Sequence, residues 1–322
     1  MIKGLYQSAG TLVFDPVASN RNATRASLHS LGFRRVDLAP TIEILTKHLG
    51  ESAPDLLLAE VTGCESEVCQ VVQALRQGEI GPNPFMVVIV TTWRRDGTVV
   101  SKVINSGADD LVARPISTSM LGDRIKLQVE RRKAFVVTSD YIGPDRRRDQ
   151  SRNGVECVEV PNSLRLRALE GLSDEESDRR VLYAVEQGKQ LLNAQKIRRD
   201  AVQLCVQWRV LEQRNQGTRD FFDNVMRLGR IASQIQRRIP YGNRDGAGDL
   251  CGVIASSVEA INTMKDDAGT DGTDLSLDYQ PNLDQLGQAA MRLGKIFAPG
   301  EADGPNIAES AILAIQQRGQ AA

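Results

Sequence analysis

FMVVIVTT at Phe85–Thr92 and DLLLAEV at Asp55–Val61 are the two stretches that decide the fold of this 322-residue chain. Both are short apolar runs, and the first is rich in β-branched residues, which favour strands. Strands that are apolar on both faces are typical of a parallel sheet, because helices cover such a sheet on either side. The sequence therefore predicts an α/β domain built around these two strands.

Three further short strands and five helices alternate with this pair along the first third of the chain. Gly32 and Gly107 end two of the helices, and Pro40 opens another, a position where its missing N–H costs nothing. Such alternation indicates a doubly wound parallel sheet at residues 10–135, with helices on both faces. The expected strands are Thr11–Phe14, Val36–Leu38 and Asp110–Ala113, and the expected helices are Asn20–Leu31, the helix opened by Pro40, Ser66–Leu75, Val99–Ser106 and Met120–Lys133.

The composition limits the partners and the compartment. A chain of 322 residues exceeds one ordinary hydrophobic core, so two domains are expected. A formal net charge of −1 gives no general attraction for nucleic acid or anionic membrane, and the apolar runs are far shorter than the roughly 20 residues that span a bilayer. Five cysteines without a CxxC spacing fit reduced thiols better than disulfides or a zinc site. We therefore expect a cytoplasmic protein that binds neither DNA nor membrane.

A charged, arginine-rich segment at residues 136–173 separates the first domain from an all-helical region. Gly143, Pro144 and Gly154 interrupt any periodic pattern there, which is typical of a linker. From 174 to 322, apolar residues recur at spacings of three and four, so each set lies on one face of a helix. Helices of this kind bury their apolar faces against one another, which predicts a helical bundle. The apolar stripes are Ile197, Ala201, Leu204, Cys205, Trp208 and Leu211; Phe222, Val225, Leu228, Ile231, Ile235 and Ile239; Leu250, Val253, Ile254, Val258, Ile261 and Met264; Leu283, Leu286, Ala290, Leu293 and Ile296; and Ile307, Ala311 and Ile315.

Polar side chains stand where the predicted strands of the first domain end. In flavodoxin-like sheets, ligands bind beyond the carboxyl ends of the strands. Those ends carry Asp15, Glu60, Thr91 and Arg114, and Pro115 follows Arg114. Together with the phrases DLLLAEV and GADDLVARP, this set resembles the CheY-like receiver domain of two-component response regulators. The resemblance implies a flavodoxin-like (βα)5 fold of strand order 2-1-3-4-5, with Glu60 at the phosphoacceptor position, Asp15 in the acidic pocket, and Thr91, Arg114 and Pro115 as switch residues.

Three departures from the family pattern concern the chemistry of phosphorylation. Glu60 stands where the family has its phosphorylated Asp, and a misplacement of about 1 Å can cost on the order of a hundredfold in rate. Pro16 replaces the second of the two adjacent acidic residues that hold Mg²⁺ in the family, so one oxygen ligand is missing. Arg114 replaces a lysine and lacks its compact ammonium group. We therefore expect a pseudo-receiver that is not phosphorylated and for which Mg²⁺ is disfavoured as a cofactor.

Two interpretations of Glu60 remain open. In the first, its carboxylate reaches toward Thr91 and pairs with Arg114, which mimics the phosphorylated state permanently. In the second, Glu60 is a polar remnant that closes the acidic pocket against Arg114.

Histidine is scarce, and this bears on the helical region. The chain has only His29 and His48, both on predicted helices of the first domain. A histidine kinase or a histidine phosphotransfer bundle needs a histidine on an exposed helix face, and residues 174–322 supply none. The segment Phe222–Ile261 resembles histidine phosphotransfer helices, with IASQIQ where that family has its histidine-bearing turn. The alternative is an unrelated helical docking domain.

The segment YIGPDRRR at Tyr141–Arg148 resembles a phrase that follows receivers in proteins of bacterial signalling pathways. Guanidinium groups suit phosphates and guanine edges, and a nearby tryptophan could stack on a base or dock a partner. A cyclic dinucleotide is therefore one ligand to consider; the alternative is a solvated hinge whose arginines pair with nearby acids. The candidate anion- or nucleotide-binding residues are Arg146, Arg147, Arg148, Arg152 and Trp93.

These observations predict a signal-transduction adaptor of the two-component type that acts by protein–protein interaction and homodimerises through its helical domain. The helical region has no Gly-rich phosphate loop, metal-ligand cluster or nucleophile–histidine pair, which argues against an enzyme. It also has no basic stripe of the kind that binds DNA. Two alternatives are a functional phosphorelay response regulator with a helical output domain, and a cyclic-dinucleotide effector that uses the arginine-rich linker.

Overall fold

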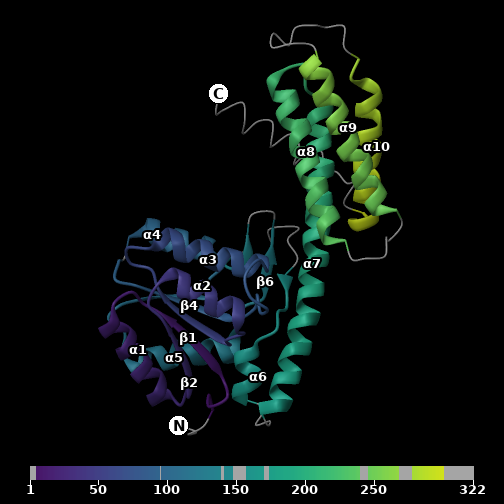
Figure 1. Ribbon diagram of the computed structural model, residues 1–322. Helices are drawn as coiled ribbons and strands as arrows, with labels where there is room; N and C mark the ends of the chain where they lie inside the picture. Colours follow the sequence, from purple (N-terminus) through teal and green to yellow (C-terminus); the bar gives the residue numbers. More distant parts are fainter. Residues whose placement is uncertain are drawn as a thin grey trace. The chain divides into compact units, whose positions relative to one another are not determined.

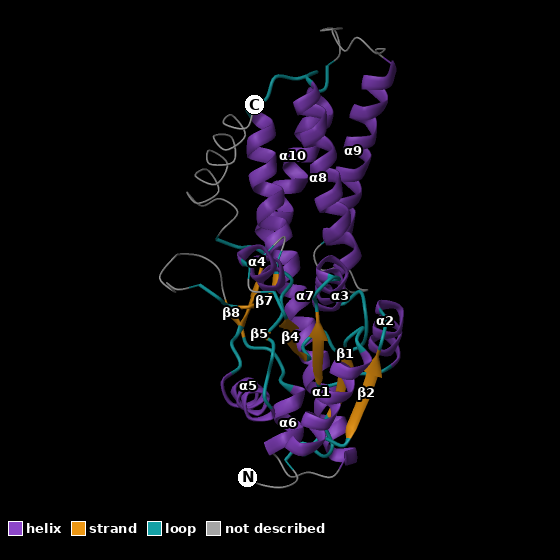
Figure 2. Ribbon diagram, turned by 90° about the vertical axis from the view of Figure 1, so that its left-hand side faces the viewer, coloured by secondary structure: helices purple, strands orange, loops and turns teal. Residues whose placement is uncertain are grey.

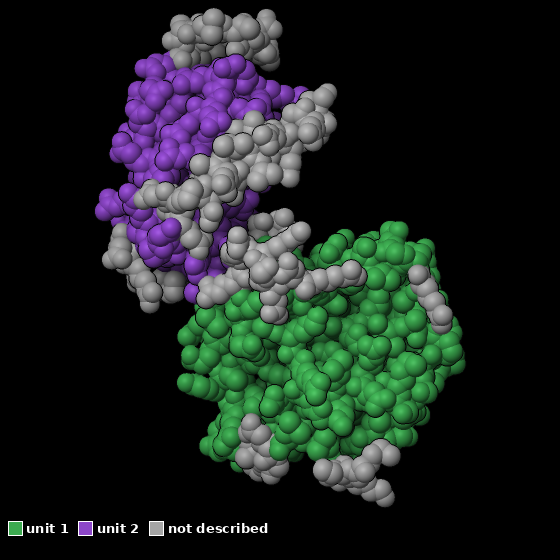
Figure 3. Space-filling view, turned by 180° about the vertical axis from the view of Figure 1, so that it is seen from behind, with its two compact units in different colours: residues 1–192 green, residues 193–322 purple. Residues whose placement is uncertain are grey.

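The computed structural model describes residues 5–94, 96–138, 141–147, 157–169, 174–239, 246–267 and 278–300. The chain divides into two compact units, Met1–Leu192 and Asn193–Ala322, called unit 1 and unit 2 below (Figure 3). Each unit has its own apolar core. The division falls later in the sequence than the domain boundary predicted at residue 174.

Unit 1 contains a five-stranded parallel sheet in the order β2-β1-β3-β4-β5 (Figures 1 and 2). The two strands that decided the prediction, β3 and β4, are neighbours and are buried along their whole length. The fold and strand order predicted from the sequence are therefore confirmed. The strands are β1 (Gly10–Phe14), β2 (Arg35–Ala39), β3 (Leu56–Glu60), β4 (Val87–Thr92) and β5 (Asp110–Ala113).

Helices cover both faces of this sheet. Apolar side chains of α2, α3 and α4 form a core on one face, and those of α1 and α5 form a core on the other. Pro40 does not open α2: the helix begins at Ile42, and the Thr41 hydroxyl accepts a hydrogen bond from the Ile44 amide, so a side-chain cap defines this end. The helices are α1 (Ala18–Leu31), α2 (Ile42–Glu51), α3 (Glu65–Gln77), α4 (Gly97–Asn105) and α5 (Thr118–Arg131).

The described parts of residues 136–173, a range predicted to be a linker, belong to unit 1 and form regular elements. Strands β6 (Phe135–Val137), β7 (Ile142–Pro144) and β8 (Cys157–Val158) form a small antiparallel sheet in the order β7-β6-β8. Helix α6 (Ser163–Leu169) packs in the same core as α1 and α5. These elements correct the linker prediction. The sequence did not reveal them, because strands of two or three residues are too short to give a periodic signal.

Buried arginines attach β6 to the parallel sheet. Arg76 is 1% exposed, and its guanidinium donates to the carbonyl oxygens of Gly107, Pro84 and Met86 and pairs with Asp109 at 2.9 Å. Arg132 pairs with the same carboxylate at 2.8 Å. Both guanidinium groups lie over the ring of Phe135, at 5.1 and 5.0 Å from its centroid. Burial lowers the pKa of Arg76 to about 10, against the effect of Asp109, so the side chain stays charged at neutral pH.

Two glycines let β7 approach the α4–β5 turn closely. Gly107 has a φ of 91°, and a Cβ atom there would lie 2.3 Å from the carbonyl oxygen of Ile142. A Cβ atom at Gly143 would lie 2.7 Å from the Cα of Gly107. Backbone therefore packs directly on backbone, and neither position has room for a side chain.

Helix α7 (Asp174–Glu212) begins in unit 1 and continues into unit 2, where it packs with three further helices (Figure 1). The predicted stripes on these helices are confirmed as the core, except that Cys205 is buried in a separate small cluster, and the stripe at Ile307, Ala311 and Ile315 lies outside the described residues. Trp208 is partly buried and packs so closely on Gly287 that a Cβ atom there would lie 2.2 Å from its ring. Every helix in the described ranges is too short or too polar to cross a membrane. The other helices of unit 2 are α8 (Arg219–Arg238), α9 (Ala247–Asp267) and α10 (Gln280–Phe297).

Candidate functional site

The carboxyl ends of four neighbouring strands bring the predicted pocket residues together. Glu60 is the last residue of β3, Thr91 lies in β4, and Asp15 and Arg114 directly follow β1 and β5. Their side chains are almost fully buried. The peptide bond between Arg114 and Pro115 is cis.

The Glu60 carboxylate is the centre of this site. Its Oε2 accepts hydrogen bonds from the Thr91 hydroxyl and from Nε of Arg114, both at 2.7 Å. Its Oε1 accepts from the hydroxyl of Thr62 at 2.5 Å and from the amide of Thr62 at 3.0 Å. Both oxygens are thus held by donors, and the side chain is only 3% exposed.

The Arg114 guanidinium lies between the two acidic residues. Besides Nε on Glu60, its Nη2 lies 3.3 Å from Oδ2 of Asp15 and donates to the Thr24 hydroxyl at 3.3 Å. Oδ1 of Asp15 accepts from the Val17 amide at 2.8 Å. Burial raises the pKa of Asp15 above its ordinary value, and the Val17 amide and Arg114 act against this rise. The site therefore contains two carboxylates and one internal cation.

The sequence did not point to two threonines of this site. Thr24 on α1 binds Arg114, and Thr62 links the buried carboxylate to the surface. The Thr62 hydroxyl donates to Glu60 and accepts from the amide of Trp93 at 2.9 Å, and the Trp93 side chain is 48% exposed. The only available signal was the position of Thr62 two residues beyond Glu60, at the end of a strand.

The donor set does not fit the Mg²⁺ ion that receivers bind. Pro16 offers no carboxylate, both oxygens of Glu60 accept hydrogen bonds, and the guanidinium of Arg114 already lies against Asp15. Across the residues that the structure describes, His, Cys, Asp and Glu side chains nowhere gather in a set of three that could hold a metal ion. Arg114 supplies the positive charge that a divalent ion would otherwise bring to two carboxylates.

The two candidate arginines that the structure describes, Arg146 and Arg147, bind different partners. Nη2 of Arg146 donates to the carbonyl oxygens of Ala108 and Asp109, and the Arg147 guanidinium binds both oxygens of Asp145 at 2.9 and 3.0 Å. Arg148 and Arg152 lie outside the described residues, and Trp93 does not line the same hollow as Arg146. Arg94 and Arg146 do share a hollow of about 350 Å³ between α4 and β5.

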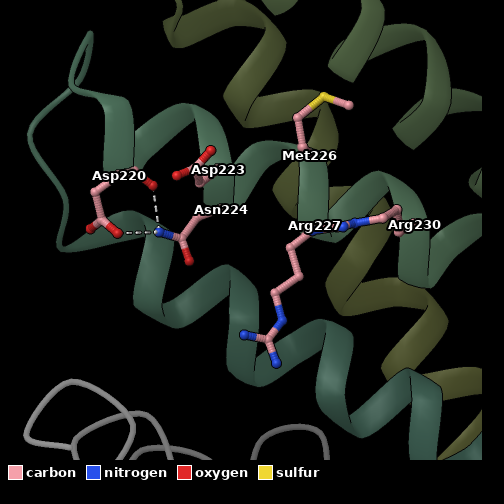
Figure 4. Close-up of a pocket in the computed structure, with 6 residues that line it drawn as sticks. All are labelled: Asp220, Asp223, Asn224, Met226, Arg227 and Arg230. Atoms are coloured by element: carbon pink, nitrogen blue, oxygen red, sulfur yellow. Dashed lines mark hydrogen bonds between the residues drawn. The ribbon is translucent and has the colours of Figure 1, made fainter. Parts of the chain in front are cut away.

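A second hollow, of about 570 Å³, lies along α8 in unit 2 (Figure 4). Its walls are Asp220, Asp223, Asn224, Met226, Arg227 and Arg230. The Asn224 amide donates to the carbonyl oxygen and the carboxylate of Asp220 on the same helix, so these groups mainly stabilise the start of α8. In the IASQIQ turn further along α8, Ser233 is exposed and donates to the Gly229 carbonyl oxygen.

Solved structures that resemble this chain match its N-terminal part. A response regulator from Thermotoga maritima is 21% identical, with a TM-score of 0.33, and the match covers 37% of this chain and 95% of that one. The chemotaxis protein CheY4 of Vibrio cholerae is 16% identical, with a TM-score of 0.33 and coverage of 37% and 96%. A CheY-like receiver domain protein from Methanospirillum hungatei is 19% identical, with a TM-score of 0.34 and coverage of 37% and 92%.

No protein-family model matches the sequence, and neither does any curated protein. The likeness to receivers concerns the fold of the N-terminal part alone. What this part binds or does has to come from its own residues.

Proposed function

We propose that unit 1 is a pseudo-receiver: a receiver fold that is not phosphorylated and that acts by binding other signalling proteins. The observation that carries this proposal is the state of the Glu60 carboxylate, whose two oxygens accept four hydrogen bonds, from Thr62, Thr91 and Arg114. The protein is then a non-enzymatic adaptor of the two-component type, and we place it in the cytoplasm.

The geometry argues against an acyl phosphate on Glu60. Phosphoryl transfer to a carboxylate needs an oxygen that can attack in line and a cation that neutralises the developing charge. Either oxygen of Glu60 would first have to break hydrogen bonds inside a buried site, one of them part of an ion pair with Arg114. Exchanging these bonded donors for a phosphoryl group and a metal ion is unfavourable, because buried charges depend on their partners.

The same contacts support the first interpretation of Glu60, that of a permanent active-state mimic. That interpretation requires the carboxylate to reach Thr91 and to pair with Arg114, and one oxygen, Oε2, does both. The Thr91 hydroxyl also accepts from Nε of Arg114 at 3.1 Å, which holds the three side chains together. The switch residues are thus fixed by the chain itself, and no modification is needed to bring them together.

Trp93 is the residue through which we expect this fixed state to reach a partner. Thr62 bonds both to Glu60 and to the Trp93 backbone amide, so the buried network is connected to the main chain that carries an exposed indole ring. Tryptophan side chains of this exposure are frequent hot spots in protein interfaces. The partner is then a protein with an apolar pocket for this ring.

Mass spectrometry of the intact protein tests the absence of phosphorylation. After incubation with Mg²⁺ and a small phosphodonor, the mass should not change. An added phosphate that is missing in Glu60→Gln would refute the pseudo-receiver and restore the phosphorelay regulator.

Affinity capture from native lysate tests the interaction role. Trp93→Ala should lose partners that the wild-type chain retains. Leu127→Ala is the matched control, because Leu127 on α5 is 44% exposed and lies outside the Glu60 network. Equal capture by both variants would contradict a docking role for Trp93.

A further inference from the structure

The first half of α7 carries an exposed apolar pair in the middle of a charged helix face. One face of this half, with Val181 and Val185, packs into the core that contains β6 and β7. Figure 1 shows this half of α7 beside α6 and β6. The neighbouring residues Leu182 and Tyr183 lie outside this core and are each 70% exposed, the largest values among the big apolar side chains that the structure describes. Large apolar side chains that remain exposed together mark interaction surfaces.

Charged residues flank the apolar pair on this side of the helix. Glu175, Arg179, Leu182, Glu186 and Lys189 follow one another at spacings of four and three, which places them along one side of the helix. Glu175, Arg179 and Glu186 are exposed, and Lys189 is half-buried. Arg179 also pairs with Glu176 of the same helix at 2.6 Å, so its contact with a second copy adds to this intrahelical pair. The charge is negative at Glu175 and positive at Arg179 before the apolar pair, and again negative at Glu186 and positive at Lys189 after it.

This order is self-complementary when the helix meets a copy of itself running the other way. Arg179 and Glu186 lie at equal distances on either side of the point midway between Leu182 and Tyr183. Glu175 and Lys189 lie at nearly equal, larger distances from the same point. In an antiparallel pair centred there, Arg179 therefore faces Glu186 of the second copy, and Glu175 faces Lys189 of the second copy.

We propose that the occupant of this face is a second copy of the chain, bound antiparallel through α7 about a two-fold axis at Leu182 and Tyr183. The two-fold symmetry repeats each contact, so the interface contains four ion pairs around two leucines and two tyrosines. A parallel pair in register would instead place Arg179 on Arg179, Glu186 on Glu186 and Lys189 on Lys189. Like charges in those positions repel, so the charge pattern selects the antiparallel arrangement.

A hollow beside Tyr183 adds an apolar recess to this interface. Its volume is about 430 Å³, and it is lined by Leu166 of α6 and by Tyr183, Ala184 and the stems of Glu176, Arg179 and Arg180 of α7. The two-fold axis places the Tyr183 side chains of both copies on the same side of the helix pair. Tyr183 of the second copy therefore lies next to this hollow. An aromatic ring beside an apolar recess is a common anchor of interfaces.

This inference is independent of the function proposed for the Glu60 site. It is tested on the full chain by sedimentation equilibrium, with charge reversals in the centre of the face. Arg179→Glu and Glu186→Arg should each raise the dimer dissociation constant by about tenfold or more, because each turns two attractive pairs into repulsive ones. The double variant Arg179→Glu/Glu186→Arg should restore the wild-type value, since the pairs re-form with their signs exchanged.

Lys126→Glu on α5 is the control, because it changes the net charge as much as Arg179→Glu and lies on another element. Circular dichroism of each variant verifies that α7 remains helical. A wild-type chain that stays monomeric at high micromolar concentration, or single variants that dimerise as the wild type does, would overturn the proposal.

A distance measurement tests the direction of the helices separately. A spin label is attached to a cysteine introduced by Gln190→Cys, an exposed position. In the antiparallel dimer each label lies more than seven residues from the symmetry axis, so at a rise of 1.5 Å per residue the two labels should be more than about 20 Å apart. In a parallel dimer they would lie at about the distance between the helix axes, roughly 10 Å. A Cys157→Ser background removes the one exposed native thiol among the five cysteines. Close labels would overturn the antiparallel arrangement even if the chain dimerises.

Discussion

Replacing Glu60 by Gln keeps the shape of the side chain and removes the charge that holds the pocket together. Removing one partner of a buried ion pair costs about 3–5 kcal/mol, because the other charge stays buried. We expect a value near the lower end, about 3 kcal/mol, since Asp15 still lies 3.3 Å from Arg114 and the Gln carbonyl oxygen can still accept from Thr91. For a unit of this size, about 3 kcal/mol corresponds to a fall in melting temperature of roughly 6–12 °C.

The two tryptophans make this measurable in unit 1 alone. Trp93 lies in unit 1 and Trp208 in unit 2, so in a Trp208→Phe background the fluorescence of Trp93 follows the denaturant unfolding of unit 1. Glu51→Gln is the control: its carboxylate is 67% exposed and pairs only loosely with Lys47, at 3.9 Å, so its effect should stay within about 0.5 kcal/mol.

A double-mutant cycle isolates the ion pair itself. Combining Glu60→Gln with Arg114→Met should give a coupling free energy of at least about 1 kcal/mol, because the two residues are in direct contact. A loss for Glu60→Gln no larger than that of the control, or additive single effects, would show that the carboxylate does not hold the network and would refute the reasoning.

Three further predictions concern other parts of the chain. Burial raises the pKa of Asp15 above its ordinary 3.8, so the stability that Asp15 contributes is fully present below that value and is lost as the pH rises through the folded-state pKa. In denaturant titrations, the free energy of unfolding of Asp15→Asn should therefore rise relative to that of the wild type between pH 4 and pH 7, and a relative fall would contradict the assignment. Trp208→Ala should lower the unfolding free energy of unit 2 by about 3 kcal/mol, because the indole packs on Gly287. Circular dichroism should show lost helicity while the sheet of unit 1 persists, and an unchanged melting temperature would mean that the ring contributes little to the core. If the arginine-rich segment binds a cyclic dinucleotide, titration should give saturable, salt-sensitive binding. Replacing both Arg147 and Arg148 by Ala should abolish this binding. Absence of binding at high micromolar ligand would leave only the hinge interpretation.

The sheet and its pocket could be predicted because their signals are local. β3 and β4 are continuous apolar runs, and the carboxyl ends of parallel strands meet at one edge whatever the rest of the chain does. The positions of Asp15, Glu60, Thr91 and Arg114 at those ends were therefore enough to place them together. Thr62 was missed, because its hydroxyl reaches Glu60 only through the turn that the backbone makes after β3.

The small sheet β7-β6-β8 could not be predicted, because its contacts are distant in the sequence. Arg76 and Arg132 both bind Asp109 and cover the ring of Phe135, and none of these residues carries a pattern that names its partners. The glycines and prolines between residues 136 and 173 suggested a break in the structure. In the described part of that segment, Gly143 and Pro144 instead lie within β7, and Pro161 lies between β8 and α6.

The close approach of Gly107 and Gly143 also has a consequence for tracing the ancestry of this chain. A methyl group at either position would collide with main-chain atoms, so no substitution of a nearby side chain could make room for it. Purifying selection on these two sites should therefore persist in any lineage that keeps β7 at this place, however far the rest of the sequence drifts. A paired glycine at these positions, together with a buried arginine in the place of Arg76, is therefore the sequence mark by which relatives that retain β7 can be told from those that have lost it.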